Sequence, residues 1–515
     1  MKRIFKYYIL IVMSVLLLAG CKKSWLDVNT DPNNPEKATL QLVFPSGVAS
    51  VASVVGGQYA ILGGIWSQYW TQSNSANQYK YIDSYQLLES SFDNQFLRIY
   101  SEGLNDLETV IRQSKAQQDW RFYLMATTMQ CYTFQVLADL YDQIPMTEAL
   151  KGTDGILSPH YNTGQEVYDT LIARLDNALS KPLNAQTATD PGTSDFVFGG
   201  DTSLWKEFAY TLELKIYLRQ MYARPDVAKA GLQKLYGDYQ GDFLTEDAAM
   251  TQFIDEASQS NPLFEDNNRQ LNVGTNLRAS TTLLSFLQKN SDPRISSYYL
   301  QANGAYKGLG QGDFNAPSTA VGGVDPSTVS VANNTAKDPV QFISAAESYF
   351  LQAEAIAYGN SKGLSLTDPN GNSEGDLYAL GVEEAFIFAG LTADDADAMT
   401  AAGEPYVYPT GGTFEQQQEA IITQKWLSMP GSHALEMVFE HNRTGYPRTS
   451  NVYSMLADHS TLNPAYVPGQ FVVPPTSVIY NQYPQRLLFP DSERSRNPNT
   501  PVEVPITTKV WWNKK

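Results

Sequence analysis

The amino-acid sequence predicts a mostly α-helical protein, and two observations support this fold class. Apolar residues recur at spacings of three and four through most of the chain, which is the pattern of helices that bury one face. Long segments rich in Gly, Asn, Asp, Pro and Ser separate the helical stretches, and no break in composition divides the chain. We therefore expect residues 39–515 to form a single helical domain with long loop insertions.

The first 20 residues have the order of a signal peptide. Basic residues lie between positions 2 and 6, and an apolar stretch at 9–18 is too short to span a bilayer securely. The stretch Leu18–Cys21 resembles the bacterial lipobox, where signal peptidase cuts before a cysteine that has received diacylglycerol. We expect residues 1–20 to be removed and Cys21 to carry the lipid. The alternative is an uncleaved anchor helix.

Residues 21–38 follow as a flexible tether, because Asp, Asn and Pro dominate them. No other stretch approaches the roughly 20 uninterrupted apolar residues of a membrane helix, so lipid alone is expected to hold the body at the membrane. Removal of residues 1–20 leaves 33 Lys and Arg against 54 Asp and Glu, which changes the net charge from −18 to −21. Such an acidic surface repels phosphate backbones, so no nucleic-acid partner is expected.

The helical pattern is clearest in four sets of apolar residues. They are Phe96, Tyr100, Leu104, Leu107 and Ile111; Val167, Leu171, Leu175 and Ala178; Trp205, Phe208, Leu212 and Ile216; and Ala346, Phe350, Ala353 and Ala357. Ala and aromatic residues at the contacts favour tetratricopeptide-like helix pairs, although no strict repeat of about 34 residues is present. The loops at 184–202, 301–338, 361–376 and 443–510 have a length typical of functional segments or insertions.

The sequence contains no convincing catalytic or metal-binding motif. The G-x-S-x-G string at 359–363 follows a helix, whereas a nucleophile elbow follows a strand. The histidines lack zinc-site spacing, and Cys131 is expected to be a buried thiol. The loop 368–372 lacks the turn glycine and closing glutamate of a calcium loop. No catalytic residue, metal or cofactor is predicted, but a carboxylate pair for glycoside hydrolysis stays open because its separation in space defines it.

Aromatic residues beside Asn and Asp are the positive signal for ligand binding. Sugar sites cover the C–H face of a ring with a flat aromatic side chain and reach the hydroxyls with polar groups. This mixture occurs between residues 66 and 85. The predicted ligand contacts in this segment are Trp70, Asn74, Asn77, Tyr79, Tyr81 and Tyr85. For Trp70, core packing is the favoured alternative, because Trp66 lies four residues before it. Beyond Ser73 the run is polar and loop-like, and for Tyr79, Tyr81 and Tyr85 binding and core packing both stay open.

A series of short motifs runs from Trp25 to Asn497. They are WLDVNTDPNNP at 25–35, ADLYDQIPMTEA at 138–149, GDTSLWKEFA at 200–209, NSDPR at 290–294, an AE-rich helix at 347–359, QKW at 424–426, NRTGYP at 442–447 and PQRLLFP at 484–490. Their order resembles the SusD-like branch of the SusD/RagB family, which are nutrient-binding outer-membrane lipoproteins of Bacteroidetes. Asp142-Gln143 stands where that family usually has Gly-Asp, and Asn442 where it has Arg.

The resemblance implies a fold in which four tetratricopeptide-like helix pairs support a loop-rich variable part. It also implies a lipid-anchored protein of the cell outer membrane that faces the exterior. Its expected partner is a SusC-type TonB-dependent barrel, over which it acts as a hinged lid that captures a nutrient. The expected ligand is an oligosaccharide. A peptide ligand, a lipid-anchored glycoside hydrolase and a purely structural subunit of the barrel complex remain as alternatives.

The resemblance also assigns roles to residues. It places the ligand site between one N-terminal segment and mid-chain loops, which adds Tyr299, Tyr306 and Phe314 to the predicted contacts, with Tyr298 beside them. Buried Arg and Glu in helical repeats usually pair with each other or cap helices. The motif residues expected to hold the scaffold are Trp205, Glu347, Glu354, Trp426, Arg443 and Arg486.

Overall fold

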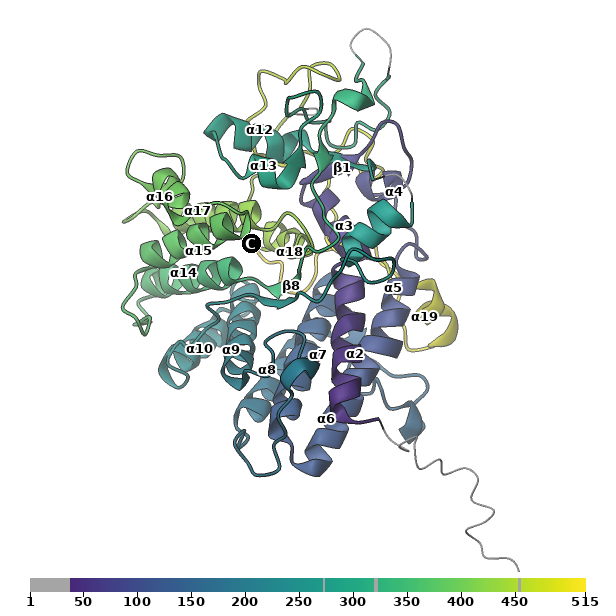
Figure 1. Ribbon diagram of the computed structural model, residues 1–515, viewed down its shortest axis with the longest axis vertical. Coiled ribbons are helices and arrows are strands. Elements are labelled where there is room, and N and C mark those ends of the chain that lie inside the picture. The colour runs from purple at the N-terminus through teal and green to yellow at the C-terminus, as the bar shows by residue number, and fades with distance from the viewer. Residues whose placement is uncertain (1–37, 272–273, 319–322, 453–454) are drawn as a thin grey trace, which may run out of the picture.

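The computed structural model describes residues 38–271, 274–318, 323–452 and 455–515. The predicted signal peptide, Cys21 and the tether lie outside these ranges, apart from residue 38 at the end of the tether. The described chain is mostly helical, as predicted (Figure 1).

Within the described residues, four helix pairs follow one another along the chain. They are α7 (Trp120–Tyr141) with α8 (Gly164–Leu179), α9 (Thr202–Arg219) with α10 (Pro225–Gly237), α14 (Ala345–Lys362) with α15 (Glu374–Phe388), and α17 (Phe414–Ser428) with α18 (Leu435–Thr444). Two N-terminal helices, α2 (Leu40–Val55) and α6 (Asn105–Gln117), pack beside α7. This is the tetratricopeptide-like pairing that was expected, and it fills the lower and left parts of Figure 1.

The remaining helices are short or lie outside these pairs. They are α3 (Gln58–Trp66), α4 (Lys80–Asp83), α5 (Asp93–Arg98), α11 (Pro262–Phe264), α12 (Thr281–Asn290), α13 (Ile295–Tyr298), α16 (Ala393–Thr400) and α19 (Asp491–Arg496). The last of these lies within the long loop predicted for 443–510. Short helical turns also occur at Ile99–Leu104 and Glu265–Arg269.

Polar residues and glycines fix the helix ends. Thr163, Ser373 and Thr413 each accept a backbone N–H from the first turn of α8, α15 and α17, and the third residue of each helix bonds back to the cap. Gly363 and Gly445, at φ of 70° and 79°, end α14 and α18 in the left-handed conformation that glycine adopts without strain.

The strands tie distant parts of the chain together. One antiparallel sheet has the order β1 (Trp70–Gln72), β5 (Leu277–Ala279), β7 (Val331–Ala332) and β6 (Tyr299–Leu300). Two smaller sheets pair β2 (Gln143–Pro145) with β3 (Tyr161–Thr163), and β4 (Ala248–Met250) with β8 (Val340–Ile343). The four-stranded sheet joins the N-terminal segment to the mid-chain loops in the upper part of Figure 1.

The helices α2 and α3 form part of the core. The stretch Leu40–Trp66 is long and apolar enough to cross a membrane, although polar residues interrupt it. However, 78% of its most apolar window is buried inside the protein. It packs against α6, α7 and α18, so we interpret it as a core element of the helical body.

Gly63 sets how closely α3 approaches α18. A Cβ atom at Gly63 would lie 2.3 Å from the backbone N of Leu435 and 2.4 Å from its Cα. Gly63→Ala should therefore lower the free energy of unfolding by about 1–3 kcal/mol, because the backbone of α18 must move. Urea unfolding measures this change.

Gly237 provides the matched control. It is the last residue of α10, and nothing lies within 4 Å of a Cβ built there. Gly237→Ala should be neutral or stabilising by up to about 1 kcal/mol, because alanine loses less backbone entropy on folding. Equal effects of the two substitutions would mean that the contact at Gly63 is not tight.

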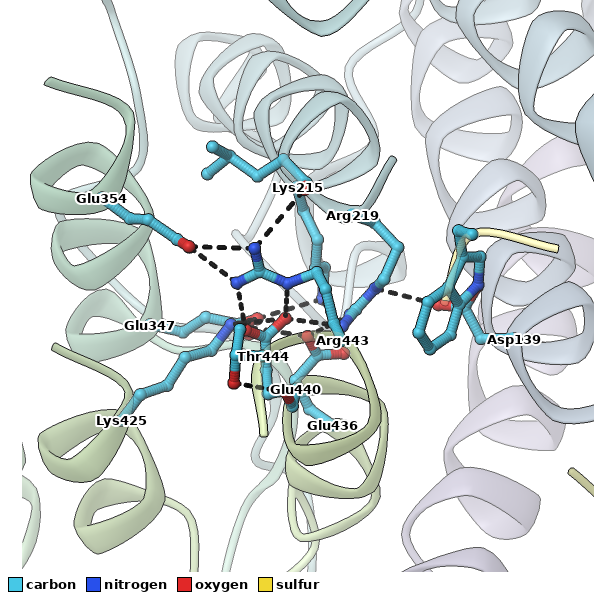
Figure 2. A network of polar contacts seen from close by, with 12 residues as sticks. Asp139, Lys215, Arg219, Glu347, Glu354, Lys425, Glu436, Glu440, Arg443 and Thr444 are labelled. Atoms are coloured by element: carbon cyan, nitrogen blue, oxygen red, sulfur yellow. Dashed lines mark hydrogen bonds and ion pairs between the residues drawn. The ribbon is translucent and has the colours of Figure 1, made fainter. Parts of the chain in front are cut away.

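Motif residues of the helix pairs meet in a buried network of ion pairs (Figure 2). Arg443 lies 2.7 Å from Glu354 and 2.5 Å from Glu440. Arg219 lies 2.5 Å from Glu440 and 3.3 Å from Asp139. These contacts connect α7, α9, α14 and α18, and they confirm the scaffold role predicted for Glu354 and Arg443.

Two lysines extend the network towards α17. Lys215 and Lys425 lie 3.3 Å and 3.1 Å from Glu347, and both also contact Glu436. His433 Nε2 lies 2.8 Å from the same Glu347. All of these side chains are nearly inaccessible to solvent. Water therefore cannot replace a lost partner, and the ion pairs hold the five helices together.

The other three motif residues also hold the scaffold. Trp205 and Trp426 are buried. Trp205 donates its indole N–H to Asp195 at 2.7 Å, and Trp426 donates its own to the carbonyl of Ser67 at 2.9 Å. Arg486 donates to the main-chain carbonyl at the end of α7. Their predicted role is thereby confirmed.

His441 attaches the C-terminal loop to α18. Its ring stacks on Phe471 with ring centroids 4.7 Å apart and meets Tyr483 at 4.6 Å. Its Nδ1 lies 3.0 Å from the carbonyl oxygen of Pro447. Burial lowers the pKa of His441 to about 4, so the ring is neutral at physiological pH.

This neutral ring makes stability depend on pH. The ordinary histidine pKa of about 6.5 applies in the unfolded chain, which therefore binds more protons than the folded chain between pH 4 and 6.5. The free energy of unfolding should fall by about 3 kcal/mol as the pH is lowered through this window. His441→Gln should lack this part of the pH dependence. Denaturant unfolding at several pH values measures this difference. If the free energy of unfolding changed equally with pH in both proteins between pH 4 and 6.5, a buried neutral ring would be contradicted.

Candidate functional site

A cavity of about 220 Å³, here called the Trp70 cavity, lies where the four-stranded sheet meets the end of α15 and the loop before α18. Its aromatic wall residues are Trp70, Tyr298 and Phe388, and its polar ones include Asn261, Asn333, Asn334, Asp338 and Gln341. Strand β1 supplies the N-terminal part of this wall, and the segments around α13 and β7 supply the mid-chain part.

Three aromatic side chains differ in how they are held. Trp70 is 2% exposed and lies over Gly64, where a Cβ would come within 2.2 Å of the indole. Tyr298 donates its hydroxyl to the carbonyl of Leu427 at 2.6 Å, and burial raises the pKa of this hydroxyl. Phe388 is 43% exposed. Two rings are therefore fixed by packing, and Phe388 is free to cover a ligand.

The polar groups of the wall are mostly fixed by hydrogen bonds. Asn333 donates to the carbonyl of Ser297 at 3.1 Å, and Asn261 donates to the carbonyl of Asp338 at 2.9 Å. The side-chain nitrogen of Asn334 is buried without a partner among the described residues. An unpaired buried donor is costly, so this N–H is available to a ligand or a water molecule.

The chemistry of this wall suits binding rather than bond cleavage. Asp338 is the one carboxylate on the wall within the described part of the chain, and it accepts the backbone N–H of Thr335 at 2.8 Å and the Thr335 hydroxyl. Glycoside hydrolysis needs two carboxylates that face the same bond. The cavity is smaller than the roughly 300–1,000 Å³ of sites that enclose a whole ligand. It can take one ring of a longer, neutral chain.

Five of the predicted ligand contacts are buried. The exposed fractions are 2% for Trp70, Tyr79 and Tyr85, 1% for Tyr299 and 7% for Phe314. Of these, Trp70 lines the cavity, whereas the rings of the other four are covered by protein. These four rings therefore offer no free face to a ligand in this conformation, because the segment that looked loop-like in sequence packs into the core.

The other four predicted contacts are more accessible. Asn77 is exposed, and Asn74, Tyr81 and Tyr306 are half-buried. Asn74 donates to the carbonyls of residues 316 and 324 at 3.3 Å and 2.8 Å, which ties the N-terminal segment to a mid-chain loop. Contact of these four residues with a ligand stays a prediction.

Sequence reasoning missed most of the polar wall. Asn333 and Asn334 lie in a turn-rich loop, where asparagine is common for backbone reasons alone. Phe388 is the last residue of α15, outside the segments from which ligand contacts were predicted. A cluster of adjacent asparagines in a long loop was the one signal available.

The residues considered for metal or nucleophile chemistry have structural partners. Asp368 accepts the backbone N–H groups of Asn370 at 2.9 Å and Asn372 at 3.1 Å, so its loop is closed by its own hydrogen bonds. The described residues contain no group of three or more metal-ligand side chains. Cys131 is a buried thiol, as predicted, and burial raises its pKa to about 12.

A family model described as starch-binding and associating with the outer membrane matches residues 32–468. No protein of curated function matches the chain.

Several solved structures share the fold. One is a chitin-binding protein with 21% identity and a TM-score of 0.71, over 92% of this chain and 99% of that one. Another is a SusD homolog from Bacteroides uniformis, with 23% identity, a TM-score of 0.68 and the same two coverages. A third is a chitin-binding SusD homolog from Flavobacterium johnsoniae, with 20% identity and a TM-score of 0.67 over 91% of this chain and 98% of that one.

Proposed function

Because the chain belongs to the SusD-like family of starch-binding proteins that associate with the outer membrane, we propose that it is a non-catalytic glycan receptor of that membrane. In this proposal it binds an oligosaccharide and delivers it to a SusC-type TonB-dependent barrel. The family match over residues 32–468 is the observation that carries the proposal. The predicted fold class, with its four helix pairs, agrees with it.

The Trp70 cavity is the proposed binding site. It combines the N-terminal and mid-chain segments that the family resemblance implies, and it offers aromatic surface beside amide groups. Two structural neighbours are chitin-binding proteins, and the family description names starch. Chito- and malto-oligosaccharides are therefore the first ligands to test.

The lipid on Cys21 and the tether to residue 38 are proposed to act as a hinge. The helix α2 begins at Leu40, two residues beyond the tether, at the lower end of the molecule in Figure 1. Attachment at one end leaves the helical body free to tilt about that point. Such tilting supports a lid that opens and closes over a membrane partner.

Phe388→Ala tests the site. Loss of this ring should weaken binding of chitohexaose or maltohexaose about 10-fold, equal to roughly 1.4 kcal/mol of contact energy. Calorimetry on residues 22–515 measures the affinity. Because Phe388 is 43% exposed, the fold should be retained.

Ile387→Ala is the matched control, since Ile387 is 47% exposed and lies beside Phe388 but outside the cavity wall. It should leave affinity unchanged. No binding of any hexasaccharide would leave the receptor proposal without support. Release of reducing ends during the titration would replace it with a lipid-anchored glycosidase.

A further inference from the structure

A second hollow with the composition of a sugar site lies on the long loop between α18 and α19. Its volume is about 320 Å³, and two runs of that loop wall it, at 449–452 and 473–481. Tyr480 lines it with 84% of its surface exposed. We propose that this Tyr480 hollow binds a sugar ring of a neutral glycan, independently of the Trp70 cavity. The inference goes beyond the proposed function, because it adds a second point of contact.

The backbone holds Tyr480 in an unusual conformation. Its φ is 56°, in the left-handed region that residues with side chains rarely adopt. Such conformations persist where the surroundings fix them, and they cluster at ligand sites. Here Val478 donates its N–H to the carbonyl of Ser84 at 3.0 Å, and Ile479 donates to the hydroxyl of Ser477 at 3.2 Å. The ring is therefore presented to solvent by a braced segment.

The opposite wall of the hollow is also braced. Ser450 donates its backbone N–H to the carbonyl of Phe471 at 2.6 Å, and the hydroxyl of Ser450 accepts the N–H of Val452 at 3.2 Å. Two successive prolines, at 474 and 475, restrict the facing run. A site whose walls are fixed before binding loses little entropy when a ligand enters.

Polar groups that can bind sugar hydroxyls line the hollow. The side-chain amides of Asn451 and Asn481 line the hollow, and both residues are exposed. Each amide can both donate to and accept from a sugar hydroxyl. No charged side chain lines the hollow within the described ranges. This excludes the ion pairs that would select an acidic sugar or a charged peptide.

Fluorine NMR on protein labelled with 3-fluorotyrosine tests the inference. The resonance that disappears in Tyr480→Phe identifies Tyr480. It should shift when chitohexaose, maltohexaose or xylohexaose is added at about 10 mM, where a site with a Kd near 1 mM is mostly filled. The same shift should occur in Phe388→Ala, because the two sites are separate.

Affinity measurements complete the test. Tyr480→Ala should weaken binding of the responding sugar at the hollow about 2- to 12-fold, the effect of one aromatic contact, whereas Tyr480→Phe should retain it. No shift of the Tyr480 resonance with any of the three sugars overturns the inference, even if binding that depends on Phe388 is found. A shift that vanishes in Phe388→Ala also overturns it, because the hollow would then not be independent.

Discussion

Arg443→Met should lower the free energy of unfolding by about 3–5 kcal/mol, because it leaves two buried carboxylates without their main partner. Burial alone would raise the pKa of Glu440, but Arg443, Lys425 and Arg219 hold this pKa far below its ordinary value. Glu354 faces Arg443 through two hydrogen bonds at 2.9 Å and 2.7 Å. Denaturant unfolding of the two proteins at pH 7 measures the loss.

The pH dependence of this loss has a definite sign. A carboxylate with a depressed folded pKa stabilises the protein above its unfolded pKa of about 4.5 and loses that contribution as the pH falls. Without Arg443, this contribution of Glu440 shrinks. The difference in the free energy of unfolding between Arg443→Met and the unchanged protein should therefore be largest above pH 4.5 and should become smaller below it.

Arg448→Met is the matched control for this prediction. Arg448 also binds a carboxylate through two nitrogens, each 2.6 Å from an oxygen of Glu419. However, the side chain of Arg448 is 60% exposed. Water can replace the lost partner there, so the cost should stay below about 1 kcal/mol. Equal losses for Arg443→Met and Arg448→Met would contradict the importance of burial.

Cys21→Ala should move nearly all of the protein from the membrane fraction to the soluble fraction. The proposed lipid on Cys21 is the only anchor that we predict, and the one apolar stretch long enough to span a membrane among the described residues is mostly buried in the core. Fractionation of cells labelled with radioactive palmitate measures both lipid attachment and location.

Cys131→Ala is the control, since Cys131 is the other cysteine of the chain and lies buried in α7. This variant should keep both the label and the membrane location. Label on Cys21→Ala, or its loss from Cys131→Ala, would contradict lipidation at Cys21.

The helical scaffold was predictable because burial imposes a period on the sequence. Val167, Leu171, Leu175 and Ala178 were expected to share one helix face, and all four are fully buried on α8. The charged motif residues predicted the buried ion pairs equally well, because a buried charge in a helical repeat is stable only beside a partner.

The proposed ligand contacts were less predictable, because composition does not tell which way a ring in a loop points. Tyr79 and Tyr85 lie in a polar stretch, yet both rings are buried. Asn334 and Phe388 are 54 positions apart in the sequence, and only the folded chain brings both to the wall of one cavity. Tyr480 lies in a loop without helical or strand periodicity, so no pattern distinguished it.

The buried ion pairs of Figure 2 have a practical consequence for engineering. The ion pairs that link α7, α9, α14, α17 and α18 come from residues within or directly beside these helices, and none of these pairs between described residues involves the loops at 301–338 or 449–481. Exposed parts of these loops can therefore be exchanged between related proteins, provided that buried loop residues such as Phe471, which packs on Trp426 and His441, are kept. A chimera that carries foreign loops should melt near the temperature of its host.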